Sequence, residues 1–238
     1  MLPSSNHSSA LASGIYALLD VDRLGCSAGG TAELERLLWY ALAAERGGAI
    51  ALQLRFKSAP LGDSLRALMA KTLVRALPKH LALVVDDDVA AAAAAGCGVH
   101  LGQTDAPVGE ARLALGPAAL IGWSTHSLDQ VHSAQRIYAN YLGFGPIRPT
   151  ASKERADAVT GWAQLSDACR ASALPIVAIG GLQSEDAVTA KACGAAAMAV
   201  IGAWLGPVDD PWPPERAAVE LVELARQWAA APGAGGAA

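Results

Sequence analysis

Short apolar segments alternate with amphipathic segments along most of the chain, and this alternation constrains the fold more than any other feature of the sequence. Apolar runs between turn-forming residues are typical of buried strands, and apolar residues spaced by three and four are typical of helices. The strands are predicted at residues 15–19, 50–55, 81–85, 99–101, 119–123, 141–144, 175–179 and 196–201. The helices are predicted at residues 32–46, 64–77, 89–95, 108–115, 128–138, 161–171, 185–193 and 214–228.

Strands that alternate with helices form parallel sheets, because each crossover helix returns the chain to the same edge. The chain has 238 residues and eight predicted strand–helix units, which favours closure into a single (β/α)8 TIM barrel of the α/β class. The competing fold is an open doubly wound sheet, but no GxGxxG motif follows the first strand. We therefore predict one barrel domain over residues 14–230, with disordered segments at residues 1–13 and 231–238.

Capping chemistry and helical spacing give local expectations as well. Thr31 is expected to be the N-cap of helix 32–46, and Asp88 the N-cap of helix 89–95. In helix 64–77 the apolar side chains expected to face inward are Leu65, Leu68, Met69 and Leu73.

Composition and charge exclude several classes of function. Hydrophobic residues make up 53% of the chain and charged residues 17%, which allows a large core and is untypical of disorder. The net charge is −4 without a basic stripe, so we expect no nucleic-acid partner. No apolar run reaches the length of a membrane span, and the first residues lack the charged and apolar regions of a signal peptide. The four cysteines are far apart and lack metal-ligand spacing, which predicts reduced thiols in a cytoplasmic protein. The sequence leaves the oligomeric state open, with a homo-oligomer among the options.

Residues that follow each strand carry the chemistry of a (β/α) barrel, because the functional loops lie at the carboxyl ends of the strands. At the end of the second strand, Gln53, Arg55 and Lys57 share one side of the extended chain. Two cations and an amide suit a polyphosphate, and the alternative is a polar rim of solvated charges.

Carboxylates follow the third and fourth strands, which are neighbours in a barrel. Asp86, Asp87 and Asp88 are consecutive, and Asp105 lies in the loop after the fourth strand. Proteins hold Mg²⁺ with one or two carboxylates together with substrate phosphates. Because Asp is also a good N-cap, we assign Asp88 to the helix and predict that Asp87 and Asp105 bind the metal.

Hydroxyl groups and a further cation follow the fifth and sixth strands. Ser124 is suited either to binding a phosphate or to capping the next helix, and His126 either to acid–base chemistry or to a structural role. The loop after the sixth strand contains Thr150, Ser152 and Lys153, and its Gly and Pro residues exclude a helix. We expect this loop to contribute to the site, with enough length to act as a lid.

Glycines follow the last two strands, where these barrels usually bind phosphate. Gly181 ends a Gly-Gly pair after the seventh strand, and Gly202 follows the eighth. Glycine lets backbone N–H groups approach an anion closely. The layout therefore predicts a monophosphate site around these glycines and a separate Mg²⁺-dependent diphosphate site, made of Arg55, Lys57, Asp87, Asp105, Ser124 and Lys153.

Six stretches of the chain, taken in order, resemble the thiamine-phosphate synthase family, which includes the related thiazole tautomerases. They are residues 53–57, 86–88, 99–105, 122–126, 143–147 with 149–153, and 177–181. The similarity extends over residues 15–204, which is most of the chain. One such stretch would be a weak signal, whereas six in the same order are specific.

The resemblance implies a transferase that joins a hydroxymethylpyrimidine diphosphate to a thiazole phosphate carboxylate, so that thiamine phosphate forms and pyrophosphate leaves. It implies that Mg²⁺ and cations assist ionisation of the pyrimidine C–O bond, after which the thiazole nitrogen attacks the carbocation-like centre. The two phosphorylated substrates are the expected partners and Mg²⁺ the expected cofactor. By position, the resemblance implies that Gln53 contacts the pyrimidine and that Asp86 stands at a substrate-binding position. It implies catalytic binding of pyrophosphate by Arg55, Lys57, Ser124 and Lys153, and metal binding by Asp87 and Asp105. Thr150 and Ser152 would contact the thiazole, and the amides of Gly181, Ile201 and Gly202 would bind its phosphate.

The chain departs from the family pattern at several of these positions. Phe56 stands where the family usually has an acidic residue, and Arg148 where it usually has an aromatic one. Ser152 replaces a usual Thr and Gly202 a usual Ser, which keeps a hydroxyl group and the backbone amides. Asp86 replaces a usual Asn that contacts substrate, and an extra carboxylate beside pyrophosphate is unfavourable unless the metal absorbs its charge.

Two alternatives to the synthase stay open at this point. One is a tautomerase-like isomerase that acts on the thiazole phosphate alone, and the other is a non-catalytic barrel that binds a thiamine precursor. Asp87, Asp105 and Lys153 favour the synthase, because an isomerase would not need them as a set for diphosphate and metal.

Overall fold

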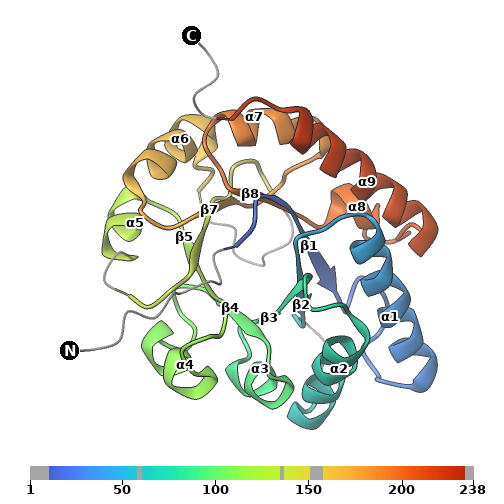
Figure 1. The fold of residues 1–238 in the computed structure, drawn as a ribbon. Helices are drawn as coiled ribbons and strands as arrows, with labels where there is room; N and C mark the ends of the chain where they lie inside the picture. The colour runs from blue at the N-terminus through green and yellow to red at the C-terminus, as the bar shows by residue number, and fades with distance from the viewer. Residues whose placement is uncertain (1–10, 58–60, 135–136, 151–157, 234–238) are drawn as a thin grey trace.

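A computed structural model describes residues 11–57, 61–134, 137–150 and 158–233, and it shows a closed barrel of eight parallel strands inside a ring of helices (Figure 1). The strands follow one another in sequence order, and β1 pairs with β8 to close the barrel. They are β1 (Gly14–Asp20), β2 (Ala51–Arg55), β3 (Ala82–Asp86), β4 (Gly98–Leu101), β5 (Ile121–Thr125), β6 (Tyr141–Phe144), β7 (Ile176–Ala178) and β8 (Ala197–Val200). The predicted (β/α)8 fold is confirmed.

The helices cover the outside of the barrel. They are α1 (Thr31–Arg46), α2 (Asp63–Ala76), α3 (Val89–Ala95), α4 (Val108–Leu115), α5 (Leu128–Ala134), α6 (Gly161–Ala171), the 3₁₀ helix η1 (Ser184–Asp186), α7 (Ala187–Ala192), α8 (Gly202–Leu205) and α9 (Pro214–Ala230). Most of the two terminal segments predicted to be disordered, namely residues 1–10 and 234–238, lies outside the described residues.

Successive side chains on each strand point alternately into the barrel and toward the helices. Tyr16 and Tyr141 belong to a buried cluster inside the barrel. Leu52, Val85 and Phe144 belong to the larger cluster between the strands and the helices. Toward the carboxyl ends of β1 to β5 the inward positions change from apolar to polar residues, which brings polar side chains to one mouth of the barrel.

Two local predictions about the helices are wrong and one is confirmed. Thr31 is the first residue of α1 and Gly30 is its N-cap, without a side-chain hydrogen bond. Leu68 is 46% exposed, because α2 buries a narrower stripe centred on Met69 and Leu73. Asp88 is the N-cap of α3, and its carboxylate accepts a hydrogen bond from the N–H three residues later.

Strand ends differ from prediction at the polar mouth. The fifth strand runs from Ile121 to Thr125, so Ser124 lies within it, and Asp86 lies within β3. The apolar pattern stops before the backbone pairing does, because inward side chains at the mouth face a polar environment. The short helix α8 was not predicted, and the predicted helix 185–193 is divided into η1 and α7.

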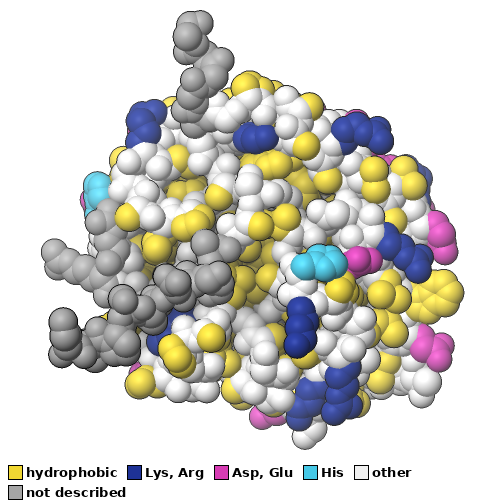
Figure 2. Space-filling view, viewed as in Figure 1, with side chains coloured by type: hydrophobic (Ala, Val, Ile, Leu, Met, Phe, Trp, Pro, Cys, Tyr) yellow, Lys and Arg dark blue, Asp and Glu magenta, His cyan; other side chains and the backbone are white. Residues whose placement is uncertain are grey.

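None of the helices in the described part of the chain is long and apolar enough to cross a membrane. On the face shown in Figure 2, charged side chains lie mainly around the ring of helices, whereas hydrophobic side chains gather toward the centre. All four cysteines are free, and Cys26 is fully buried.

Candidate active site

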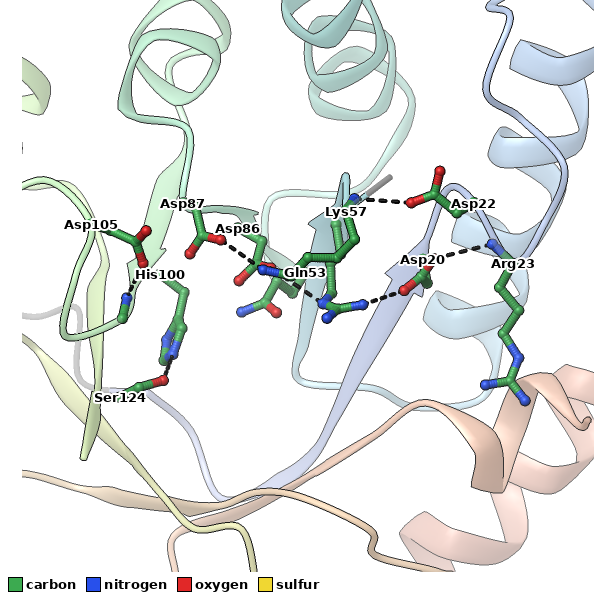
Figure 3. Close-up of polar contacts among 12 residues, drawn as sticks. Asp20, Asp22, Arg23, Gln53, Lys57, Asp86, Asp87, His100, Asp105 and Ser124 are labelled. Carbon is green, nitrogen blue, oxygen red and sulfur yellow. Dashed lines mark hydrogen bonds and ion pairs between the residues drawn. The ribbon is translucent and has the colours of Figure 1, made fainter. Parts of the chain in front are cut away.

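A cluster of alternating charges lies at the carboxyl ends of β1, β2 and β3 (Figure 3). Arg55 Nη1 donates to Asp20 Oδ2 at 2.5 Å, and Arg55 Nε lies 3.3 Å from Asp86 Oδ2. Lys57 Nζ lies 3.3 Å from Asp86 Oδ2 and 2.8 Å from Asp87 Oδ2. The two cations predicted to bind an anion are therefore together at the mouth, and each is paired with carboxylates.

Burial and neighbouring charges shift the pKa values of this cluster in opposite ways. Burial, followed by repulsion from Asp87, raises the pKa of Asp86 to about 6, against the attraction of Lys57 and Arg55. Burial alone would lower the pKa of Lys57, but the carboxylates of Asp86 and Asp87 outweigh it and raise that pKa. Lys57 is thus a fixed cation at neutral pH, and Asp86 is the carboxylate whose charge the site tolerates least.

Asp87 and Asp105 come together from neighbouring strands, as predicted for a metal site. Asp87 has a left-handed backbone conformation (φ 61°), and its N–H donates to the carbonyl oxygen of His100 at 2.8 Å. Asp105 Oδ2 accepts from the N–H of Gly102 at 2.6 Å. The carboxyl groups of Asp87 and Asp105 are in hydrogen-bonding contact, and burial and Asp87 raise the pKa of Asp105.

This donor set fits Mg²⁺ bound through substrate. Within the described ranges no group of three or more His, Cys, Asp or Glu side chains could hold a metal ion. Two adjoining carboxylates are the usual protein share of a Mg²⁺ site whose other ligands are phosphate oxygens and water. The two carboxyl groups also repel each other unless a proton or a cation lies between them.

The charge cluster borders a cavity of about 390 Å³, lined by Phe56, Lys57, Arg66, Asp86, Asp87, Asp88, Val89 and Ala106. A larger cavity of about 500 Å³ lies at the opposite end of the barrel, where residues such as Ala82, Gly98 and Leu120 begin or precede their strands. Its lining is mostly apolar, whereas the functional groups of these barrels lie at the carboxyl ends of the strands. The smaller cavity is therefore the candidate site.

Five buried polar side chains form a hydrogen-bonded chain across the barrel interior. Gln53 Nε2 donates to the Tyr16 hydroxyl at 3.2 Å, and the hydroxyl oxygens of Tyr16 and Tyr141 are 2.8 Å apart. The Tyr141 hydroxyl lies 3.0 Å from Nδ1 of His100, whose Nε2 lies 2.8 Å from Ser124 Oγ. The predicted site residues Gln53 and Ser124 are thus linked through three residues that were not predicted.

Gly122 provides the space in which Tyr141 and His100 meet, so an added methyl group should disrupt the fold there. A Cβ atom on Gly122 would lie 2.1 Å from Tyr141 Cζ and 2.4 Å from His100 Nδ1. We expect Gly122→Ala to lower the free energy of unfolding by about 1–3 kcal/mol, because buried rings must shift. Gly109→Ala in α4 is the control: its Cβ meets nothing within 4 Å, and we expect a gain of about 0.5–1 kcal/mol.

Urea unfolding followed by circular dichroism measures both glycine variants. If Gly122→Ala were as stable as the wild-type protein, Tyr141 and His100 would have room to separate and their contact would not be fixed by packing.

The loops after β6, β7 and β8 meet where the second anion site is predicted. Gly181 has a positive φ of 71°, and a Cβ there would lie 2.4 Å from a carbonyl oxygen of the loop that leads to Thr150. Ile201 directly precedes α8, and Gly202 is its first residue. The guanidinium of Arg23, from the loop after β1, lies 3.8 Å from the position that a Cβ on Gly202 would take. The structure thus adds a cation, Arg23, beside the predicted backbone site.

Two predicted residues of the lid, Ser152 and Lys153, lie outside the described residues. At the base of that loop, Arg148 Nε donates to Asp186 Oδ1 at 3.0 Å, so the residue that departs from the family pattern ties this loop to η1. Nδ1–H of His126 donates to the carbonyl oxygen of Gly145 at 2.5 Å, which is a structural contact between the loops after β5 and β6.

Sequence reasoning missed Asp20, Tyr16, Tyr141 and His100. Asp20 is the first polar residue after the first apolar run, so the rule applied to the other strands would have found it. Tyr16, Tyr141 and His100 lie on the strands, and only the alternation counted back from the mouth indicates that they point inward.

A parallel (β/α)8 barrel with charged and hydrogen-bonding side chains at the carboxyl ends of its strands defines the class of TIM-barrel enzymes. Comparison with known proteins identifies the family. The sequence profile of the family described as thiamine monophosphate synthase matches residues 28–204. The chain belongs to this family.

Curated relatives and a solved structure agree with that membership. The chain is 41% identical over 181 residues to a thiamine-phosphate synthase of Anaeromyxobacter dehalogenans, covering 76% of this chain and 79% of the relative. It is 40% identical over 198 residues to a thiamine-phosphate synthase of Thiobacillus denitrificans, covering 82% and 90%. The thiamine phosphate pyrophosphorylase structure from Pyrococcus furiosus is similar with a TM-score of 0.69 at 30% identity, covering 90% of this chain and 97% of that one. The resemblance predicted from the six stretches is confirmed.

Proposed function

We propose that the protein transfers the hydroxymethylpyrimidine group from its diphosphate to the nitrogen of a thiazole phosphate, forming thiamine phosphate and releasing pyrophosphate. The observation that carries the proposal is the convergence of Arg55, Lys57, Asp87, Asp105 and Ser124 at one mouth, in a chain whose curated relatives bear the synthase name. An isomerase acting on a monophosphate alone would have no use for this set.

Breaking the pyrimidine C–O bond leaves its electron pair on the departing pyrophosphate, so the site must stabilise negative charge that grows during the step. Arg55 and Lys57 supply fixed positive charge at the mouth, and the Ser124 hydroxyl supplies a donor from β5. Gln53 is the next inward-facing residue of β2 below Arg55, and it would orient the pyrimidine. Lys153 would add a further cation from the loop after β6.

Asp87 and Asp105 would hold Mg²⁺, which supplies Lewis-acid stabilisation of the pyrophosphate oxygens when bound. Their adjoining carboxyl groups support metal binding in which oxygens of the diphosphate substrate supply further ligands. Lys57, which pairs with Asp87, would then contact both the metal ligand and the leaving group.

The thiazole phosphate would occupy the mouth beside the loops after β6, β7 and β8. Thr150 and Ser152 would face the thiazole ring, and the amides of Gly181, Ile201 and Gly202 would bind its phosphate, with Arg23 providing the neighbouring charge. We further propose a cytoplasmic location, because all four cysteines are free thiols.

The test is pyrophosphate release by purified protein with both substrates, with each substrate alone, and with EDTA. Release that needs both substrates and Mg²⁺, with thiamine phosphate formed, is the expected result. Conversion of the thiazole phosphate without pyrophosphate release would instead indicate the isomerase. Binding without turnover would indicate the non-catalytic barrel.

Asp86→Asn should improve binding of the diphosphate substrate. The asparagine keeps a hydrogen-bond acceptor for Arg55 and Lys57 but removes a buried negative charge beside these two cations, which are proposed to bind the pyrophosphate. We expect KM for the pyrimidine diphosphate to fall by about three- to tenfold at pH 7.5, as for the loss of one like-charge contact. Steady-state kinetics at saturating thiazole phosphate measures this KM. An unchanged or higher KM would mean that Arg55 and Lys57 already neutralise the Asp86 carboxylate, so that it does not weaken diphosphate binding.

A further inference from the structure

The row of hydrogen bonds from Gln53 to Ser124 runs through the barrel interior, and its donors all point the same way, from Gln53 toward Ser124. Its five members come from β2, β1, β6, β4 and β5 in that order, and none is more than 8% exposed. These side chains are therefore shielded from bulk solvent, and a hydroxyl proton without an acceptor in this hydrogen-bonded network would be costly.

The direction is set at the Gln53 end, because an amide nitrogen donates and cannot accept. The Tyr16 oxygen accepts from Gln53, so the Tyr16 proton needs an acceptor, and the Tyr141 oxygen lies 2.8 Å away. If Tyr141 donated to Tyr16 instead, the Tyr16 proton would have no acceptor among its described hydrogen-bond partners. Tyr16 therefore donates to Tyr141.

The same reasoning fixes the imidazole. The Tyr141 proton is directed to Nδ1 of His100, 3.0 Å away, so Nδ1 must be the unprotonated nitrogen of a neutral ring. A charged imidazolium, or a ring protonated on Nδ1, would leave the Tyr141 proton without an acceptor among the described residues, because the Tyr16 oxygen already accepts from Gln53 and donates to Tyr141. The ring proton then lies on Nε2 and is donated to Ser124 Oγ at 2.8 Å.

Packing holds this arrangement in place. The rings of His100 and Tyr141 are stacked, with centroids 5.5 Å apart and an angle of 28° between their planes. Gly122 and Gly143 leave room for the imidazole, since a Cβ on Gly143 would lie 3.2 Å from His100 Cε1. Burial raises the pKa of both tyrosines well above the usual range, so both hydroxyl groups stay protonated.

We propose that His100 is a positioning residue for Ser124: a neutral imidazole protonated on Nε2 donates to Ser124 Oγ, so that the serine presents its own O–H as a donor to the diphosphate of the substrate. Tyr16 and Tyr141 fix the tautomer, and Gln53 sets the direction of the chain. The inference rests on the proposed function, in which Ser124 contacts pyrophosphate, and it deepens that function by naming what orients the donor.

The first test reads the tautomer in the free protein and needs no activity. Long-range ¹H–¹⁵N correlation spectra of protein labelled on histidine nitrogen, with the His100 signals assigned through His100→Gln, report which ring nitrogen carries the proton. We expect a neutral ring protonated on Nε2 between pH 7 and 8, and a mixture of tautomers in Tyr141→Phe. A ring protonated on Nδ1, or an imidazolium, would overturn the inference.

The second test asks whether Tyr141 acts through Ser124. We expect Tyr141→Phe to lower kcat for pyrophosphate release by about tenfold with KM for the thiazole phosphate unchanged, as for one weakened hydrogen bond in the transition state. In a Ser124→Ala background the same change should have no further effect on kcat, because the group it positions is gone. If the double variant lost kcat by the product of the two single-variant factors, Tyr141 would act independently of Ser124.

Tyr40→Phe is the matched control. Tyr40 is also buried, and its hydroxyl donates to the carbonyl oxygen of Trp212 at 2.6 Å. It is not one of the hydrogen-bonded residues that link Gln53 to Ser124. Its kcat should stay within about twofold of wild type even if stability falls. The proposed function fails if the wild-type protein releases no pyrophosphate, whereas this inference fails on the His100 tautomer or on the double variant, so the two failures are distinct.

Discussion

Asp87→Asn is expected to lower kcat/KM for pyrophosphate release by about 10²- to 10³-fold, and to shift the Mg²⁺ concentration needed for activity upward. The change removes one of two adjoining carboxylates and keeps the size of the side chain. Asn also tolerates the left-handed backbone that Asp87 adopts at φ 61°, so the variant should fold as the wild-type protein does. A Mg²⁺ titration of initial rates, with thermal unfolding as a check on folding, measures the effect.

Asp88→Asn is the matched control for this variant. Asp88 follows Asp87 directly, but its carboxylate caps α3 and pairs with Arg66 at 2.6 Å. Asn caps a helix about as well as Asp, so the Mg²⁺ dependence should stay as in the wild-type protein. Equal loss in the two variants, or an unchanged Mg²⁺ dependence in Asp87→Asn, would remove Asp87 from the metal site.

Lys57→Met should lower kcat by a similar factor, about 10²- to 10³-fold, while the affinity for the thiazole phosphate stays unchanged. Lys57 is the half-exposed cation between Asp86 and Asp87, and its raised pKa keeps it charged through the neutral range. Methionine matches its length without the charge, so charge on the departing pyrophosphate would be stabilised less. Lys57→Arg keeps the cation and should recover part of the rate.

Lys79→Met controls for the general loss of a surface charge, since Lys79 is exposed and lines the cavity at the opposite end of the barrel. Single-turnover measurements separate the chemical step from product release. A Lys57→Met variant with wild-type single-turnover rate would show that Lys57 does not stabilise the leaving group.

Much of the fold and part of the site could be predicted from the sequence, because both depend on local pattern. Alternating apolar and amphipathic segments are enough to define eight β/α units, and several helices begin and end where capping and spacing place them, as α3 and α4 do. The positions of Arg55, Lys57, Asp87 and Asp105 follow from one rule, that functional residues lie where barrel strands end.

Strand ends at the mouth and the pairing of charges depend on the closed barrel and could not be predicted from local sequence. Strand ends at the mouth are set by pairing with neighbouring strands, so Ser124 and Asp86 belong to strands although the apolar pattern stops before them. The partners of Arg55 come from β1 and β3, and no local signal shows that Asp20 and Asp86 would lie on either side of its guanidinium.

The chain from Gln53 to Ser124 shows the same limit most clearly. Tyr16 and Tyr141 are 125 residues apart in sequence. Their hydroxyl groups meet because, in the closed barrel, side chains of β1 and β6 point into the same interior. The sequence by itself determined the class of fold, the mouth that carries the chemistry and the family. The tertiary structure decided which charges pair and how the buried hydroxyl groups are linked, because long-range contacts depend on strand order and closure and not on neighbours in the chain.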